Sequence, residues 1–274
     1  MKQNIKIAIL DMYNGFANEG MRCIQMICGE FLRQEGIKGN YDIFDVRKKN
    51  EIPKIEHYDI FISTGGPGNP LPEGHDWEAK FGDFLDQIFK HNRSNENKKF
   101  LFLICHSFQI ASNHLQLGNV CKRRSTSFGV MPIHRTSEGE TEPFFNGLPE
   151  IFYAVDSRDY QIILPNWQKV NDFGAKVLCL EKIREYIPLE RAIMAIRFSE
   201  EVFGTQFHPE ADAEGMLSYF KQEEKMIAVI SEHGSDKYEL MIDHLDDPDK
   251  IMLTESIIIP SFLNHAAKQI IAIA

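Results

Sequence analysis

The sequence predicts an α/β fold in which a mainly parallel central sheet is flanked by helices. Short apolar runs rich in β-branched residues recur along the chain, segments with helical spacing separate them, and turn-forming glycines follow two of these runs. Strands that alternate with helices in this way form parallel sheets covered on both faces. Between residues 120 and 197 the runs become shorter and are separated by Gly, Pro and Asn, which indicates antiparallel strands appended to the parallel core.

The individual elements follow from the same patterns in chain order. Strands of the parallel core are expected at residues 5–10, 41–46, 58–63, 100–104 and 202–207. Apolar residues three and four positions apart predict helices over 17–34, 77–91 and 107–117, and Gly36 and Gly118 stand where two of them would end. The expected antiparallel strands are residues 129–133, 151–155, 160–164, 176–180 and 192–197.

The last part of the sequence reads as helical. Residues 213–230 form one expected helix, and from Ser231 onward two or three more are expected, with an acidic linker at 243–249 and a break at Pro260. We therefore expect one domain over residues 1–230 and a helical C-terminal extension over 231–274 packed on it. The apolar segment 251–274 must bury its surface against other residues. Packing on its own domain is the favoured interpretation, and a homodimer is the alternative.

Composition excludes several classes of function. The 274 residues carry a net charge of −10, which argues against nucleic-acid binding, because phosphates require concentrated Lys and Arg. Five cysteines without a repeating spacing favour a reducing compartment over a disulfide framework. The N-terminal apolar run is too short for a signal peptide, and no apolar run is long enough to cross a bilayer. A cytoplasmic protein without membrane or nucleic-acid partners is the expectation.

Three residues have the chemistry of a nucleophilic site. The buried run FLFLI ends at Cys105 and turns directly into an amphipathic segment, the layout of a nucleophile elbow. His208 and Glu210 follow a later apolar strand in the motif GTQFHPE. A cysteine nucleophile needs an imidazole base, and the base needs a carboxylate to orient it. Cys105, His208 and Glu210 are therefore the candidate catalytic residues.

A glycine-rich loop follows the strand at 58–63. The segment Thr64-Gly65-Gly66-Pro67-Gly68 places backbone without side chains at the carboxyl end of a buried strand, where an open α/β sheet binds its ligands. A surface turn is the alternative interpretation of this loop alone. Of the remaining histidines, none lies at HxxxH or HExxH spacing, so no metal site is expected.

These motifs together resemble the class I glutamine amidotransferase domain, over roughly the first four-fifths of the chain. The resemblance rests on GTQFHPE at 204–210, on TGGPG at 64–68, on DMYNGF at 11–16 and, in part, on Ile104-Cys105 with Gln109. It implies a flavodoxin-like fold with a mainly parallel sheet. It also implies hydrolysis of a glutamine side-chain amide through a cysteinyl thioester, with release of ammonia and without metal or organic cofactor.

The resemblance also implies roles for further residues. The backbone N–H groups of Gly66 and His106 would form the oxyanion hole. Gln109 falls where the family contacts the amino-acid end of the substrate, and Gly65 is a further expected substrate contact. Arg158, in the segment 156–160, is a candidate for binding the charged end of the substrate, although a surface loop is the favoured interpretation of that segment.

Two features depart from the family pattern. Leu103 and Ser107 stand where the nucleophile motif usually has glycines, and Leu103 implies either that a neighbouring element has retreated or that the elbow is shifted. Beyond Glu210 too few residues follow for a synthetase domain, and the sequence has no nucleotide-binding glycine loop.

Three functions therefore remain open from the sequence. The chain is a glutaminase subunit serving a separate synthetase, such as that for GMP, or a stand-alone γ-glutamyl hydrolase or peptidase. The third alternative is a catalytically weak binding or regulatory module on the same fold.

Overall fold

The computed structural model describes residues 4–186, 188–221, 223–247 and 250–273. Its strands are β1 (Ile5–Asp11), β2 (Gly39–Asp45), β3 (Ile60–Ser63), β4 (Phe100–Ile104), β5 (Asn119–Arg135), β6 (Ile151–Ile163), β7 (Lys176–Glu181), β8 (Ile193–Arg197) and β9 (Val202–Thr205). Its helices are α1 (Glu19–Leu32), α2 (Val46–Lys49), η1 (Ile55–His57), α3 (Asp76–Ser94), α4 (His106–His114), α5 (Ser137–Glu140), η2 (Pro143–Phe145), α6 (Trp167–Phe173), α7 (Ala213–Phe220), α8 (Glu223–His233), α9 (Ser235–Asp246) and α10 (Ile251–Ile273).

Within the described residues the strands join in one sheet, in the order β2-β1-β3-β4-β9-β8-β7-β5-β6. The strands from β2 to β9 in this order are parallel, and those from β9 to β6 pair antiparallel. The predicted α/β class with a mainly parallel core is therefore confirmed. The antiparallel strands continue the hydrogen-bonded ladder of the parallel core from its β9 edge.

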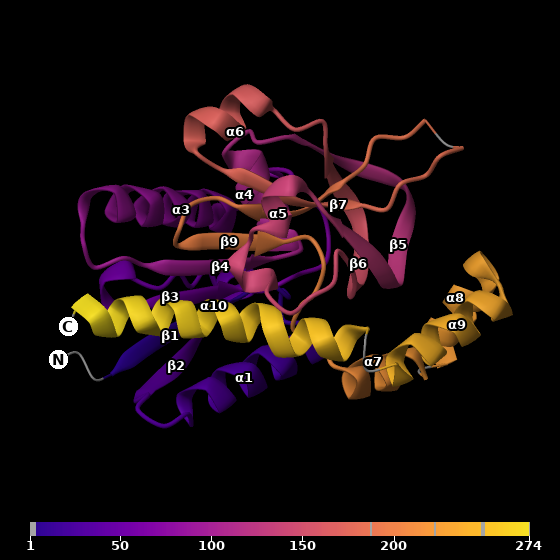
Figure 1. Ribbon diagram of the computed structural model, residues 1–274, viewed down its shortest axis with the longest axis horizontal. Coiled ribbons are helices and arrows are strands. Elements are labelled where there is room, and N and C mark those ends of the chain that lie inside the picture. Colours follow the sequence, from indigo (N-terminus) through magenta and orange to yellow (C-terminus); the bar gives the residue numbers. More distant parts are fainter. Residues whose placement is uncertain (1–3, 187, 222, 248–249, 274) are drawn as a thin grey trace.

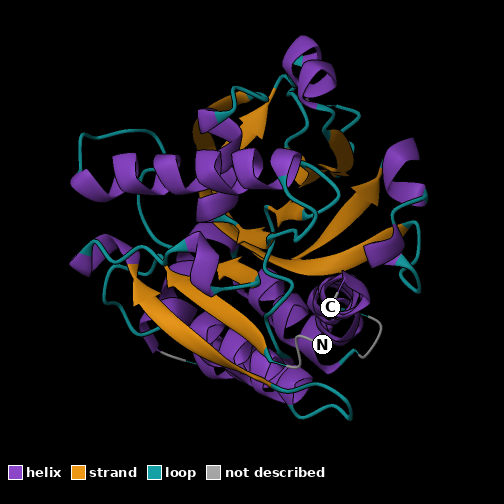
Figure 2. Cartoon of the chain, turned by 90° about the vertical axis from the view of Figure 1, so that its left-hand side faces the viewer, coloured by secondary structure: helices purple, strands orange, loops and turns teal. Residues whose placement is uncertain are grey.

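Helices cover both faces of this sheet (Figures 1 and 2). Along β4, Phe100, Phe102 and Ile104 enter the apolar core shared with α1 and α10, whereas Leu101 and Leu103 enter the core shared with α3. The alternation follows from the two-residue period of a strand. Because both faces are buried, β4 is apolar throughout, which is why its sequence reads as a continuous apolar run.

The C-terminal helix α10 is part of this core. Its side chains at Ile258, Phe262 and Leu263 are buried against the sheet and α1, and each such burial stabilises the fold by roughly 1.5–3 kcal/mol. The expected break at Pro260 is wrong, since α10 continues through it. Packing of the apolar face outweighs the one backbone hydrogen bond that proline removes.

Two other boundaries differ from the sequence expectation. The predicted helix at 213–230 is two helices, α7 and α8, and α8 runs past position 230, where the extension was expected to begin. Together with α9 these helices cover a small separate core on β5 and β6 that contains Val130, Val155 and Met241. No helix in the described part of the chain is long and apolar enough to cross a bilayer.

Candidate active site

Cys105 forms a sharp turn at the carboxyl end of β4. The strand ends at Ile104 and α4 begins at His106, so one residue makes the connection. Cys105 has φ of 47° and ψ of −97°, a conformation that residues with a side chain rarely adopt. The Cys105 amide donates to the Thr205 carbonyl at 2.7 Å, and the Gln109 amide donates to the Cys105 carbonyl at 2.9 Å. These bonds hold the strained geometry of a nucleophile elbow.

Ser107 replaces one of the expected glycines and fastens the elbow. Its buried hydroxyl accepts a hydrogen bond from the Ile104 amide at 3.0 Å and donates one to the Ser63 carbonyl at 2.9 Å. A glycine at this position would supply neither partner. The serine therefore links the turn at Cys105 to the end of the neighbouring strand β3. It does not disturb the turn.

Leu103 replaces the other expected glycine, and its neighbour explains how it fits. It pairs with Gly204 on β9. A Cβ on Gly204 would lie 3.2 Å from the Leu103 Cβ and only 2.7 Å from Cδ2 of Phe108. The space for Leu103 thus comes from a missing side chain on the adjacent strand. Leu103 itself is buried in the core with α3 and does not line the cavity beside Cys105.

His208 follows β9 and is held beside Cys105. Its amide donates to the Val155 carbonyl at 2.8 Å, and its Nδ1 lies 2.8 Å from Oε1 of Glu210. His208 and Cys105 border the same cavity, and the interaction with Cys105 contributes to the raised pKa of His208. Glu210 is fully buried, so its carboxylate is a fixed acceptor that orients the imidazole. The structure brings together the three residues that the sequence singles out.

The surroundings of His208 favour its charged form. Burial alone would lower its pKa, because an apolar environment disfavours the imidazolium. The negative charges of Glu210 and of the Cys105 sulfur, with the hydrogen bonds to both, outweigh burial and raise the pKa of His208 well above 6.5.

The glycine-rich loop packs so closely that side chains are excluded. A Cβ on Gly66 would lie 2.3 Å from the Met12 carbonyl oxygen, and one on Gly65 would lie 2.7 Å from Cε1 of His208. Both contacts are far below van der Waals distance. Glycine is therefore required at both positions for the loop to reach the cysteine and the histidine.

Arg47 fixes the loop from the side. Its Nη1 donates to the Pro67 carbonyl at 2.5 Å and to the Met12 carbonyl at 3.1 Å, and its guanidinium lies 5.2 Å from the Trp77 ring centroid. Sequence analysis missed Arg47, because it lies in the polar run RKK, which is typical of a solvated helix. Only its contacts with distant residues reveal its role.

His106 is the first residue of α4, directly after the nucleophile. Burial, with a contribution from the nearby charge of Arg47, lowers the pKa of its imidazole to about 3. The side chain is therefore neutral over the physiological range. His106, at the N-terminus of α4, and Gly66 both border the cavity beside Cys105.

The cavity has a volume of about 510 Å³. Of the residues singled out by sequence, those that border it are Gly66, Cys105, His106, Gln109, Arg158, His208 and Glu210. Gly65 does not border the cavity and packs against His208 instead. The lining also includes the apolar side chains of Phe16, from the motif DMYNGF, and of Phe128 and Met216, which the sequence alone did not indicate.

The expected surface loop at 156–160 is wrong, because these residues lie in the middle of β6. The Arg158 side chain is only 1% exposed; its Nε lies 2.9 Å from Oδ1 of Asp156 and its Nη2 lies 3.4 Å from Oε1 of Glu181. Asp156 and Glu181 both pair with this guanidinium, although Glu181 is shared with Arg123 and Arg184. Nη1 of Arg158 has no hydrogen-bond partner among the described residues, and Arg158 borders the cavity.

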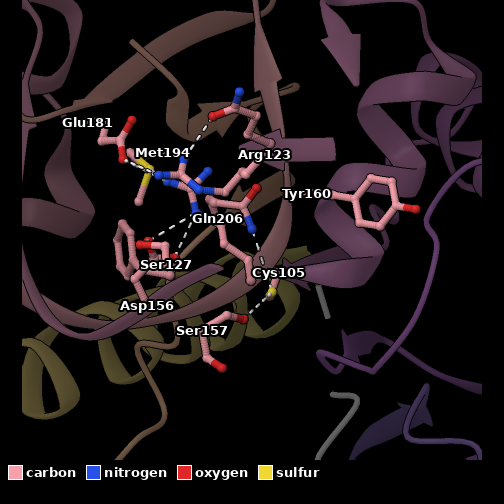
Figure 3. Close-up of polar contacts among 12 residues, drawn as sticks. Cys105, Arg123, Ser127, Asp156, Ser157, Tyr160, Glu181, Met194 and Gln206 are labelled. Carbon is pink, nitrogen blue, oxygen red and sulfur yellow. Dashed lines mark hydrogen bonds and ion pairs between the residues drawn. The ribbon is translucent and has the colours of Figure 1, made fainter. Parts of the chain in front are cut away.

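The Gln109 side chain is also engaged within the protein. Its Nε2 donates to the Tyr160 carbonyl at 3.0 Å and to Oε1 of Gln206 at 2.9 Å. Gln206 reaches the nucleophile, with its Nε2 3.5 Å from the Cys105 sulfur (Figure 3). Sequence analysis missed Gln206, although it lies within the motif GTQFHPE, because His208 and Glu210 account for the known chemistry of that motif.

The cysteines are free thiols: Cys23, Cys28, Cys105, Cys121 and Cys179. Over the described ranges, no group of three or more His, Cys, Asp or Glu side chains is arranged to hold a metal ion.

The fold and the site define a class of α/β proteins with a cysteine elbow at the carboxyl edge of the sheet. Residues 28–223 match the family model "Glutamine amidotransferase class-I", which spans more than half of the chain. The chain belongs to the class I glutamine amidotransferase family, a family that generally uses a cysteine nucleophile. No curated protein matches the sequence.

Solved structures agree on the fold. A glutamine amidotransferase from Thermotoga maritima superimposes with a TM-score of 0.65 at 15% identity, covering 96% of this chain and 98% of that one. The Trypanosoma brucei CTPS glutaminase domain with bound acivicin superimposes with a TM-score of 0.58 at 14% identity, covering 96% of this chain and 94% of that one. A putative GMP synthase subunit from Thermoplasma acidophilum superimposes with a TM-score of 0.50 at 18% identity, covering 85% of this chain and 97% of that one. At these identities the likeness shows the fold, and it confirms the predicted fold class.

Proposed function

We propose that this chain hydrolyses the side-chain amide of glutamine, or of a γ-glutamyl compound, through a thioester on Cys105 and releases ammonia. The observation that carries the proposal is that Cys105, His208 and Glu210 border one cavity, with His208 Nδ1 2.8 Å from Oε1 of Glu210. A free thiol is only a few per cent thiolate at neutral pH, and an adjacent imidazole is the usual means of activating it.

In the first half of the reaction, the Cys105 sulfur attacks the amide carbon and its proton passes to His208. The tetrahedral intermediate collapses when the carbon–nitrogen bond breaks and His208 protonates the leaving ammonia. Glu210 keeps the imidazole oriented throughout. A thioester between Cys105 and the γ-carbonyl remains.

In the second half, water attacks the thioester carbonyl while His208 takes up its proton. The carbon–sulfur bond then breaks, glutamate leaves, and the cysteine is regenerated. Both halves pass through a negatively charged oxygen, which needs two hydrogen-bond donors. The backbone N–H groups of Gly66 and His106 are the proposed donors, and loss of one such donor typically costs about 3 kcal/mol of transition-state stabilisation.

This proposal has two versions, which differ in the substrate that the chain hydrolyses. In the first, the chain is a glutaminase subunit that supplies ammonia to a separate synthetase, for which the structural likeness to a putative GMP synthase subunit is the support. In the second, it is a stand-alone γ-glutamyl hydrolase. The cavity of about 510 Å³ favours this second version, because it has room for a leaving group larger than ammonia.

A catalytically weak regulatory module is the alternative from another class. Its support in the sequence was Leu103, as a residue that would disable the elbow. Since Leu103 fits opposite Gly204 and does not line the cavity, that support is removed.

The deciding experiment measures ammonia release from glutamine and product release from a panel of γ-glutamyl amides and peptides by the purified chain. Ammonia from glutamine, stimulated by a copurifying synthetase, supports the first version, and turnover of larger γ-glutamyl compounds supports the second. A chloroketone analogue of glutamine should label Cys105 stoichiometrically, and the labelling should vanish in Cys105→Ala and His208→Ala. Failure both to label and to turn over any compound would refute the proposal.

A further inference from the structure

The Gln206 side chain lies against the proposed nucleophile. It is fully buried, and its Nε2 is 3.5 Å from the Cys105 sulfur, a normal distance for an N–H···S hydrogen bond. The sulfur also lies 3.7 Å from the Ser157 carbonyl oxygen, and Figure 3 shows the two contacts on different sides of the sulfur. Besides His208, the sulfur thus has one neighbour that only accepts and one that donates.

The orientation of the Gln206 amide is fixed by a chain of hydrogen bonds. The Tyr160 carbonyl can only accept, so it must face the NH₂ group of Gln109 at 3.0 Å. The same NH₂ group lies 2.9 Å from Gln206 and can only donate, so it must face the Gln206 oxygen. The NH₂ group of Gln206 is then the part that faces the sulfur. Reversing either amide would bring two donors, or two acceptors, into contact.

We propose that Gln206 is a further catalytic residue that donates a hydrogen bond to the Cys105 thiolate, and that Gln109 is a positioning residue that keeps this donor directed at the sulfur. This deepens the proposed function and rests on the reaction given there. It gives Gln109, which also borders the cavity, a second role besides the expected substrate contact.

The two neighbours of the sulfur have opposite effects on its protonation. The thiol donates to the Ser157 carbonyl, which stabilises the protonated form. When the proton passes to His208, the sulfur becomes an acceptor only, and the amide of Gln206 then stabilises the anion. The thiolate forms twice in the cycle, before attack and again when the thioester breaks, so the same donor serves both halves.

The effect of Gln206 on the thiol can be distinguished from the effects of the charged groups around the sulfur. The titratable groups that interact with Cys105 include His208 and Tyr13, Glu210 pairs with His208, and His106, Arg158 and Asp159 border the same cavity. Gln206 is uncharged, so replacing it with methionine, which has a similar length, removes the donor without altering net charge. A purely structural role would change the stability of the fold and leave the acidity of the thiol unchanged.

The test measures the rate at which iodoacetamide alkylates Cys105 as a function of pH, followed on the Cys105 peptide by mass spectrometry. In Gln206→Met the apparent pKa of the thiol should rise by about one unit, which makes alkylation at neutral pH about tenfold slower. Gln109→Leu should give a smaller rise in the same direction, because Gln206 is then free to turn. Gln168→Met, an exposed glutamine on α6, is the matched control and should leave the profile unchanged.

An unchanged thiol pKa in folded Gln206→Met would overturn the inference. If that variant does not fold, Gln206→Glu decides in its place, because it keeps the acceptor for Gln109 and puts a carboxylate beside the sulfur. It should raise the thiol pKa at least as much, and an unchanged value would again overturn the inference. If the wild-type chain hydrolyses no amide but the variants show the shifts in thiol pKa, the proposed function alone is refuted. If the wild-type chain hydrolyses an amide but the variants show no shift in thiol pKa, the role of Gln206 alone is refuted.

Discussion

Leu103 on β4 and Gly204 on β9 are direct partners in the parallel ladder, and the side chain of one occupies the space that the other leaves empty. The nucleophile strand therefore tolerates a large residue two positions before Cys105. The compensation lies on a strand about a hundred positions later in the sequence, next to the strand end that delivers His208. Gly204 is the first residue of the motif GTQFHPE, so Leu103 is accommodated by a residue that follows the family pattern.

This pairing predicts that Gly204→Ala is costly. Its Cβ would lie 2.7 Å from Phe108 and 3.0 Å from Phe198 as well as close to Leu103, so overpacking should lower the free energy of unfolding by about 1–3 kcal/mol. Urea denaturation measures this loss in the free energy of unfolding. The control is Gly29→Ala inside α1, where the nearest atom would be 3.5 Å away; it should stabilise by roughly 0.5–1 kcal/mol. Equal effects at the two glycines would contradict the packing argument.

Glu210→Gln should lower the pKa of His208. The charge of Glu210 is one of the interactions that raise this pKa against the effect of burial, so its loss leaves burial less opposed. In the wild type, the stabilisation from protonated His208 is fully present below pH 6.5 and is lost as the pH rises through the elevated folded-state pKa.

NMR titration of the His208 ring carbon measures this shift, and amide hydrolysis should fall with it. Glu214→Gln, at an exposed position on α7, serves as the control and should leave the titration unchanged. If His208 titrated alike in Glu210→Gln and the wild type, the carboxylate would not be the source of the raised pKa.

His106 should make the fold sensitive to acid. Its folded-state pKa is lowered to about 3, so between pH 6.5 and 3 the unfolded chain binds a proton that the folded chain does not. Stability is therefore lost as the pH falls, by about 1.4 kcal/mol per pH unit from this residue. His106→Gln should flatten the dependence of the unfolding free energy on pH over this range. A profile as steep as that of the wild type would assign the acid sensitivity to other groups.

Arg158→Met distinguishes a structural from a substrate-binding role. Removing the guanidinium leaves the buried Asp156 without its ion-pair partner, which should destabilise the fold by about 3–5 kcal/mol. Arg184→Met removes another partner of Glu181, but Arg184 is 24% exposed, and the cost should be about 1 kcal/mol or less. A folded Arg158→Met with an unchanged unfolding midpoint and a raised KM would instead support direct binding of substrate.

Local patterns in the sequence were sufficient for the elements with strong periodicity. The apolar run before Cys105, the helical spacing of α1 and α3, and the strand that precedes His208 all appear in the structure within a few residues of the expected positions. The three catalytic candidates followed from the chemistry that a thiol requires, and the structure places them together.

What sequence alone did not reveal depends on partners far away in the chain. The strand β6 is continuous because β5 pairs with it on both sides of a register irregularity at Lys122–Ser127, and because Arg158 finds buried carboxylates. Arg47 and Gln206 look ordinary in their own segments. Their contacts, with Pro67 and with the Cys105 sulfur, exist only after the sheet has formed.

The join between β4 and β9 has a consequence for synthesis of the chain. The thiol sits on one strand, while its base and its amide donor follow the other, with Gln206 lying 101 positions after Cys105. Under the proposed function, a polypeptide still emerging from the ribosome carries Cys105 without its base and its amide donor for as long as β9 is missing, because these groups reach the sulfur only once that strand has paired with β4.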